Sequence, residues 1–148
     1  MPAVLVTARA ALVGGLICAA AACGTETDPA RELAPWQEPA AYTYTLRSTE
    51  GERSLIGTFR ITVRDGAVVK AVGLDDSGRR VVEDIPEEVP TIGELLAELE
   101  QARRDDADKA EAEHADDGHP VRISLDWMEN AIDDEALYVI SDFAPGRG

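Results

Sequence analysis

The segment LIGTFRITVRDGAVVKAVGL, residues 55–74, restricts the fold of this chain more than any other stretch. Its first half alternates apolar and polar side chains, a pattern typical of a strand with one buried face. Asp65 and Gly66 follow, and glycine tolerates the positive dihedral angles of a two-residue hairpin turn. Pairing outward from this turn places Val63 opposite Val68. The segment therefore predicts a β-hairpin with one apolar face.

The same register makes a prediction for the one charged side chain on the second strand of the hairpin. Continued from the turn, the pairing sets Phe59 opposite Val72, and Lys70 then falls opposite Ile61 on the apolar face. A lysine can lay its apolar stem along such a face and keep its ammonium group in water. We therefore expect Lys70 at an edge of the sheet.

One amphipathic helix is predicted within VPTIGELLAELEQARRD, residues 89–105. Thr91 followed by Glu94 forms a capping box, which satisfies backbone amides at a helix start. The apolar residues form one stripe and the polar residues lie away from it, with Ile92, Leu95, Leu96, Leu99 and Ala102 on the stripe and Glu94, Glu98 and Gln101 off it. The helix should pack by one side, with Leu99 against a sheet and Glu98 in solvent.

The rest of the chain after residue 41 predicts mainly strands. Alternation of apolar and polar residues marks the segments 42–47, 120–127 and 136–143. RRVVED, residues 79–84, is a candidate for a further strand. Residues 107–120 fit either an edge strand or a frayed helix. Strands, then one helix, then strands, joined by short links, predict an α+β fold. We expect an antiparallel β-sheet with one amphipathic helix packed on one face.

The start of the chain has the features of an export signal. Arg9 precedes an apolar run, residues 10–22, that is shorter than the roughly 20 residues a membrane-spanning helix needs. Three alanines then precede Cys23, as in a bacterial lipobox, whereas bulkier residues precede Cys18. In lipoproteins of this kind the cysteine carries diacylglycerol, and two acyl chains anchor a protein firmly.

This interpretation divides the chain into three parts. Residues 1–22 are the expected signal peptide, 23–41 the lipidated cysteine with a proline-rich flexible tether, and 42–148 a single α+β domain. A secretory signal without lipidation and an uncleaved anchor remain alternatives. Trp36 belongs either to the tether or docks on the domain. The expected location is the extracytoplasmic face of the bacterial cell membrane.

The chain is strongly acidic, with a formal net charge of −15 from 14 basic and 29 acidic side chains. This balance disfavours nucleic acid, whose phosphates bind basic surfaces, and no nucleic acid partner is expected. Acidic residues are dense between residues 83 and 117. Their simplest interpretation is a solvated face that keeps an exported domain soluble.

Five segments together resemble a known family. They are YTYTL, FRITVRDGAVV, PTIGELL, GHPVRISLD and DDEALYVISDF, in this order over residues 42–143. The set resembles the bacterial lipoproteins grouped as domain of unknown function six-one-seven-four. The resemblance implies a secreted or lipid-anchored α+β domain without an assigned activity. Members often carry a cysteine near residues 48–50, which this chain lacks, and a more aromatic strand before Gly118.

Candidate metal ligands gather in two places. Hard oxygen ligands of the kind that calcium prefers come from Asp126, Asp133, Asp134 and Glu135. The surrounding sequence lacks the glycine of an EF-hand loop, so these residues are candidates only for a looser site. His114 and His119 flank two aspartates, but two imidazoles do not complete a four-ligand zinc site. We therefore expect no metal and no cofactor.

Candidates for a binding site are His119, Trp127 and Met128. His119 with Asp126 would make an acid–base pair if the fold brought them together. Trp127 and Met128 would form a protein-contact patch if both are exposed, and otherwise close one end of the core. The sequence has no nucleophile elbow, no phosphate-binding glycine loop and no HExxH motif, so an enzyme is not expected.

These features favour a lipid-anchored acidic envelope protein that acts as a non-catalytic binding or accessory module. Its expected partners are the membrane, through Cys23, and an envelope protein. Two alternatives stay open: a weak calcium-dependent or metal-sensing module, and an envelope hydrolase with an unrecognised site. Calcium titration of thermal stability tests the first alternative, because a ligand that binds only the native state raises the unfolding midpoint.

Overall fold

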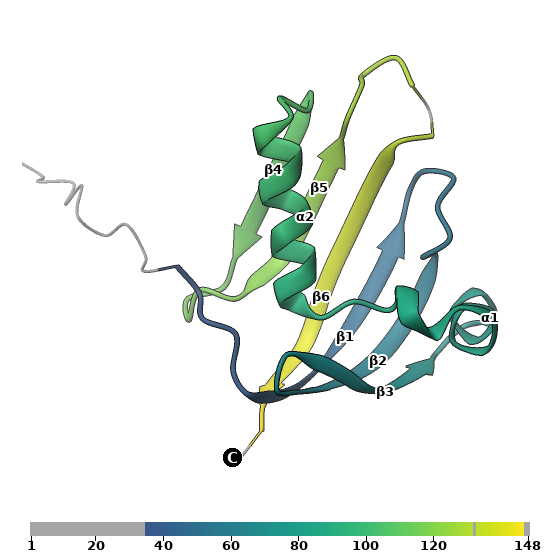
Figure 1. The fold of residues 1–148 in the computed structure, drawn as a ribbon, viewed down its shortest axis with the longest axis vertical. Coiled ribbons are helices and arrows are strands. Elements are labelled where there is room, and N and C mark those ends of the chain that lie inside the picture. Colours follow the sequence, from purple (N-terminus) through teal and green to yellow (C-terminus); the bar gives the residue numbers. More distant parts are fainter. Residues whose placement is uncertain (1–34, 132, 147–148) are drawn as a thin grey trace, which may run out of the picture. The chain divides into compact units, whose positions relative to one another are not determined.

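The computed structural model describes residues 35–131 and 133–146, which form a six-stranded antiparallel sheet with two α-helices (Figure 1). The strands are β1 (Ala41–Thr49), β2 (Gly57–Arg64), β3 (Ala67–Gly73), β4 (Lys109–His114), β5 (Pro120–Asp126) and β6 (Glu135–Pro145). Their order across the sheet is β3-β2-β1-β6-β5-β4, so β3 and β4 are the two edges. The predicted α+β class and antiparallel sheet are confirmed.

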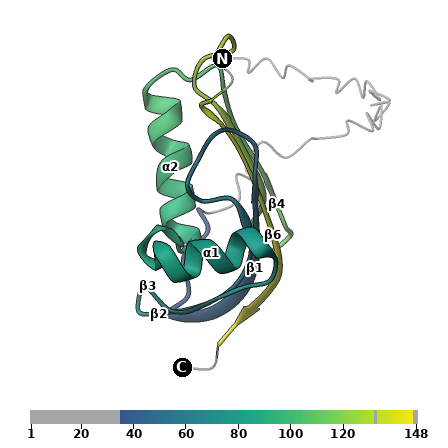
Figure 2. The same cartoon turned by 90° about the vertical axis from the view of Figure 1, so that its right-hand side faces the viewer.

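The helices α1 (Asp76–Asp84) and α2 (Ile92–Arg104) lie between β3 and β4 in the chain, with the short 3-10 helix η1 (Pro86–Glu88) between them. Both α-helices cover the same face of the sheet (Figure 2), α1 over β2 and β3 and α2 over β4 and β5. The opposite face carries no helix in the described part of the chain. We call it the open face, and on β2 it presents Thr58, Arg60, Thr62 and Arg64.

Helix α1 replaces the strand predicted at residues 79–84, and that prediction is wrong. Asp75 caps the helix by accepting a hydrogen bond from the backbone amide of Gly78 at 2.7 Å. Glycine at position 78 allows a close approach to the sheet, because a Cβ there would lie 2.5 Å from the carbonyl oxygen of Thr58. Val81 is buried in the core. The cap and the close approach outweigh the preference of valines for strands.

The β2–β3 hairpin is confirmed, but most of its predicted register is wrong. Val63 pairs with Val68 as expected, after which Val69 is left without a partner in a β-bulge. The extra residue shifts the remaining pairs by one position, so Lys70 lies opposite Thr62 and not Ile61. Lys70 is therefore on the open face, where its charge needs no burial.

Helix α2 is confirmed with its capping box. The Thr91 hydroxyl accepts from the amide of Glu94 at 3.1 Å, and the Glu94 carboxylate accepts from the amide of Thr91 at 2.7 Å. Leu99 is 1% exposed and packs in the core. The predicted solvent position of Glu98 is wrong, because its side chain bonds to residues of the sheet and of the β1–β2 loop.

The core lies between the helices and the inner face of the sheet. Its largest buried side chains include Tyr42, Tyr44 and Tyr138. Trp36 packs edge-on against Tyr42 and Phe143, with ring centroids 6.3 and 6.0 Å apart. Trp36 thus docks on the domain, the second of the two alternatives for this residue.

Two further expectations concern residues 107–120 and the start of the chain. The stretch with two alternatives, residues 107–120, contains the edge strand β4 and not a helix. The expected signal peptide and Cys23 lie outside the described residues. Within the described residues, none of the helices has the length and apolar character that crossing a membrane requires.

Candidate binding surface

The carboxylates proposed as calcium ligands lie at the two ends of the β5–β6 connection. Asp126 ends β5 and pairs with Glu135 at the start of β6, and Asp133 and Asp134 precede it. One oxygen of Asp126 and both oxygens of Asp134 are buried without a hydrogen-bond partner. Nevertheless, no three His, Cys, Asp or Glu side chains of the described residues converge as a metal site requires.

His119 contacts different residues from those needed for an acid–base pair. Its ring stacks on Phe143 with centroids 4.4 Å apart, and its Nδ1 contacts the Asp117 carboxylate. The hydrogen bond from the backbone amide of His119 lowers the pKa of Asp117. His119 precedes β5 and Asp126 ends it, so the strand separates the two side chains. This arrangement shapes the β4–β5 turn.

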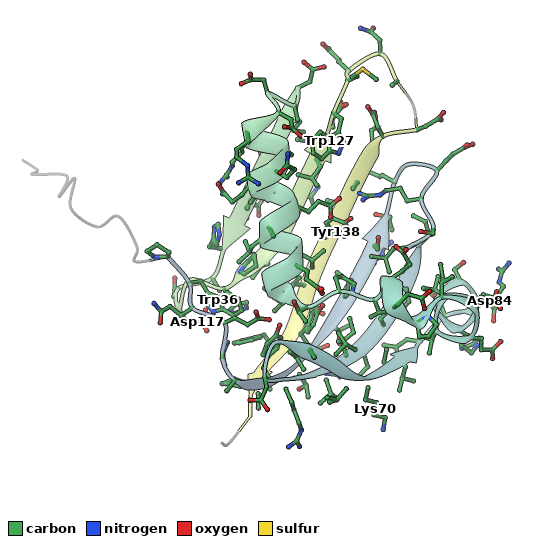
Figure 3. The ribbon with its side chains drawn as sticks, in the orientation of Figure 1. Trp36, Lys70, Asp84, Asp117, Trp127 and Tyr138 are labelled. Atoms are coloured by element: carbon green, nitrogen blue, oxygen red, sulfur yellow. The ribbon has the colours of Figure 1, made fainter. Side chains whose placement is uncertain are left out.

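Trp127 and Met128 do not form a shared surface. Trp127 is partly buried and packs against the core cluster, whereas Met128 is 60% exposed (Trp127 is labelled in Figure 3). Their positions match the simpler alternative, in which the tryptophan helps to close one end of the core.

A polar cluster between α2 and the sheet was not expected from the sequence. The Tyr138 hydroxyl donates to Glu98 Oε2 at 2.9 Å, and Arg53 Nη2 donates to Glu98 Oε1 at 2.5 Å. The Arg53 guanidinium also lies over the Tyr138 ring. Burial, followed by the Glu98 carboxylate, raises the pKa of Tyr138. Arg53 Nη1 is buried without a hydrogen-bond partner. The two bonds to Glu98 nevertheless tie α2 to β6 and to the β1–β2 loop.

The N-terminus of α2 is closed by the chain itself. The amide of Ile92 donates to the Tyr42 hydroxyl at 2.9 Å, and the amide of Gly93 donates to Glu38 Oε1 at 3.3 Å. Burial and the hydrogen bond to Glu38 raise the pKa of Tyr42. With the capping box, these contacts engage the amides of residues 91–94, so this helix end offers no site for an anion.

The edge strand β3 exposes apolar side chains. Large hydrophobic side chains that are exposed in the described residues are Val69 (55%), Val72 (41%), Leu74 (49%) and Met128. Three of these four lie on β3 or directly after it. β3 pairs only with β2 in the described part of the chain. An uncovered apolar edge of this kind invites pairing with another strand.

The other edge is protected. β4 carries Lys109, Glu111 and Glu113, and charged side chains on an edge strand discourage pairing. In addition, Arg103 Nε of α2 donates to the carbonyl oxygen of Ala110 at 3.3 Å. The charge content of the two segments, AVVKAVG against KAEAEH, was a usable sequence signal for this difference.

A groove with a volume of about 410 Å³ runs beside β3 on the helix side. Its apolar lining includes Val68, Ala71, Val82 and Val89, and its polar lining consists of Lys70, Glu87, Thr91 and Glu94. β3, α1, η1 and the start of α2 contribute these residues. The groove and the free edge of the strand therefore form one continuous surface, which we call the β3 edge.

The open face next to β3 is basic although the whole chain is acidic. Lys70 is exposed and points away from the ribbon (Figure 3), and Arg60 and Arg64 lie on the neighbouring strand. Arg60 lies 3.9 Å from Asp142. Among the described residues, Lys70 and Arg64 have no such acidic neighbour. The β3 edge thus has a largely apolar groove side with two glutamates, and an opposite side on which Lys70 lies with the exposed Val72.

Comparison with known proteins identifies the family but adds no activity. No curated protein and no solved structure matches the chain. A family model described as "Family of unknown function (DUF6174)" matches residues 26–145, which include the whole sheet and both helices. The chain therefore belongs to the family of unknown function DUF6174.

Proposed function

We propose that this protein is a non-catalytic binding module, held at the extracytoplasmic face of the cell membrane by a lipid on Cys23. The observation that carries the binding role is the β3 edge. It combines free backbone groups, exposed apolar side chains and a largely apolar groove. β4 also has a groove beside it, of about 370 Å³, but that groove is lined mainly by charged side chains. Exposing such an edge costs solubility, and a partner that covers it removes this cost.

The anchor rests on the sequence around Cys23. Residues 1–22 serve as the signal peptide in this proposal, and three alanines precede the cysteine after a short apolar run. The residues between Cys23 and Trp36 then form the tether. An envelope protein is the partner, because the acidic chain would be repelled by anionic lipid and by nucleic acid.

Metabolic labelling with an alkyne analogue of palmitate tests the anchor. The protein should incorporate the label, and Cys23→Ser should abolish it and release the protein from membranes. Cys18→Ser is the matched control, because Cys18 leaves with the signal peptide and its loss should not reduce labelling. Undiminished labelling of the Cys23→Ser protein would rule out the lipid anchor.

One observation favours a calcium-dependent module as a second candidate. The buried carboxylate oxygens of Asp126 and Asp134 have no hydrogen-bond donor, and a cation would satisfy them. Millimolar calcium should then raise the unfolding midpoint, and Asp134→Asn should remove the increase. An unchanged midpoint would eliminate this candidate and leave the first proposal intact.

A further inference from the structure

The β3 edge offers backbone hydrogen-bonding groups in a defined order. The amide of Leu74 donates to the carbonyl oxygen of Thr58 on β2 at 2.7 Å. Backbone groups alternate in direction along an antiparallel strand. Those of Val72 and Lys70 therefore face β2, and the N–H and C=O of Ala71 face the free edge. A further strand can form hydrogen bonds there.

The two faces of an added strand would meet different chemistry. Side chains on the helix side would enter the groove beside Val68, Val82 and Val89. Glu87, Glu94 and Lys70 also line this groove, and the two carboxylates would repel acidic side chains close to them. Side chains on the opposite side would lie next to Lys70 and the exposed Val72, with Arg60 on the following strand. Since successive residues of a strand point to opposite faces, the best match alternates apolar and acidic residues.

We propose that β3 accepts an extended segment of a partner protein as a seventh strand, with apolar residues in the groove and acidic residues beside Lys70. This inference rests on the proposed binding function and names the chemical class of the partner. Main-chain hydrogen bonds provide the affinity, and the alternating side chains provide the specificity, as in other cases of strand addition.

A second copy of this chain fits the β3 edge less well. Antiparallel pairing of two β3 strands about a two-fold axis would place Lys70 of both copies on the same face of adjacent strands, with Arg60 and Arg64 one strand further from the axis. Like charges at such short separation destabilise cross-strand pairs. Each chain also carries a formal net charge of −15, which adds to the repulsion. A partner strand with acidic residues beside Lys70 avoids the first of these penalties.

Fluorescence anisotropy with the full chain, purified in mild detergent, tests this proposal. The probe is a fluorescein-labelled peptide that alternates valine and glutamate and is about nine residues long, enough for one strand. It should bind saturably, and a valine–lysine peptide of the same length should bind roughly tenfold more weakly or not at all. The same valine–glutamate peptide with N-methylated backbone amides should not bind, because it cannot complete a strand ladder.

Two charge-reversed variants locate the site. Lys70→Glu should weaken binding of the valine–glutamate peptide by roughly threefold to tenfold and improve binding of the valine–lysine peptide. Lys109→Glu is the matched control, since Lys109 is an exposed lysine on the other edge strand, and it should leave binding within about twofold. Circular dichroism confirms that both variants are folded.

Several results would overturn the proposal. They are the absence of saturable binding of the valine–glutamate peptide, equal binding of the N-methylated peptide, and equal effects of Lys70→Glu and Lys109→Glu. A concentration-dependent dimer in sedimentation experiments that Val69→Lys abolishes would instead assign the β3 edge to a second copy. None of these results depends on the lipid, so failure here and failure of the Cys23 anchor are distinguishable.

Discussion

The two edge strands of the sheet differ in how their unpaired backbone groups are protected from pairing with another chain. On β4, charged residues alternate along the strand, and Arg103 Nε of α2 donates a hydrogen bond to the backbone carbonyl oxygen of Ala110. On β3, one lysine stands among small and apolar residues, and no helix side chain of the described residues is seen to donate to the edge. Proteins commonly blunt their edge strands to prevent unwanted pairing. Because β4 is protected and β3 stays apolar, the two edges of this sheet differ in their tendency to pair with another strand.

The two helices also differ, in how many contacts hold them to the sheet. Helix α2 is fixed by a closed N-terminus, a buried apolar stripe and the contacts of Glu98. Helix α1 is short and is held by the Asp75 cap and the close approach of Gly73 to Arg79. The comparison suggests that the half of the sheet under α2 provides most of the stability, and the half under α1 provides the binding edge. Four predictions test this division.

The largest expected effect belongs to Leu99→Ala in α2. Leu99 is 1% exposed in the core, and such substitutions cost about 2 to 5 kcal/mol through lost burial and the cavity left behind. Urea unfolding followed by circular dichroism measures the change. The matched control is Leu74→Ala, because Leu74 is 49% exposed after β3 and should change stability by less than about 0.5 kcal/mol. Equal losses would contradict the division.

Glu98→Ala should have the second largest effect. It removes the acceptor of Tyr138 and Arg53 and leaves buried polar groups unpaired, which costs about 1 to 3 kcal/mol. Glu100→Ala is the control, since Glu100 is on the exposed side of the same helix and bonds only to Arg103. Its loss should change the free energy of unfolding by less than about 0.5 kcal/mol. A similar result for both variants would mean that the polar cluster does not stabilise α2.

The third prediction concerns the Asp75 cap of α1. Burial acts to raise the pKa of this carboxyl, but the hydrogen bonds from the Gly78 amide and from Thr58 lower it overall. A carboxyl whose folded pKa is depressed stabilises the protein above its unfolded pKa of about 3.9, and loses this effect as the pH falls through the folded pKa. Asp75→Ala should cost about 0.5 to 2 kcal/mol at neutral pH.

An asparagine at position 75 separates the cap from its charge. Asn can accept the same hydrogen bond, so Asp75→Asn should retain most of the stability at neutral pH. It should also remove the contribution of Asp75 to acid destabilisation below about pH 4. Unfolding curves at pH 7 and at pH 3 measure both effects. If Asp75→Asn unfolds like Asp75→Ala at neutral pH, the carboxylate charge and not the cap geometry stabilises α1.

The sequence predicts the elements of this fold better than their relationships. The capping box of α2 and the β2–β3 hairpin follow from local patterns, because both depend on residues close together in the chain. The β-bulge at Val69 is not visible in the alternation, since its effect on register depends on pairing with β2. Residues 79–84 look like a strand because Val81 and Val82 favour strands, and only tertiary contacts show that α1 forms there.

The candidate binding surface was harder to predict for the same reason. Glu98 and Tyr138 are 40 residues apart in the chain, so nothing local indicates their hydrogen bond. The edges of a sheet depend on the order of all its strands, which the hydrophobic pattern of single segments does not determine. Once the order is known, the contrast between AVVKAVG and KAEAEH becomes meaningful.

The smallest effect on stability is expected when a charge is added to β3 and one is removed from β4. This exchange also tests the comparison of the two edges most directly. Val69 is 55% exposed and has no partner on β2, so Val69→Lys should change the free energy of unfolding by less than about 0.5 kcal/mol. It should nevertheless reduce light scattering on heating, because lysine on an edge strand opposes pairing between chains. Glu111→Val on β4 is the converse change and should increase scattering, although the Arg103 contact at Ala110 limits the increase. If Val69→Lys leaves scattering unchanged while Glu111→Val raises it, chains associate through β4, and the apolar composition of β3 does not make it the more adhesive edge.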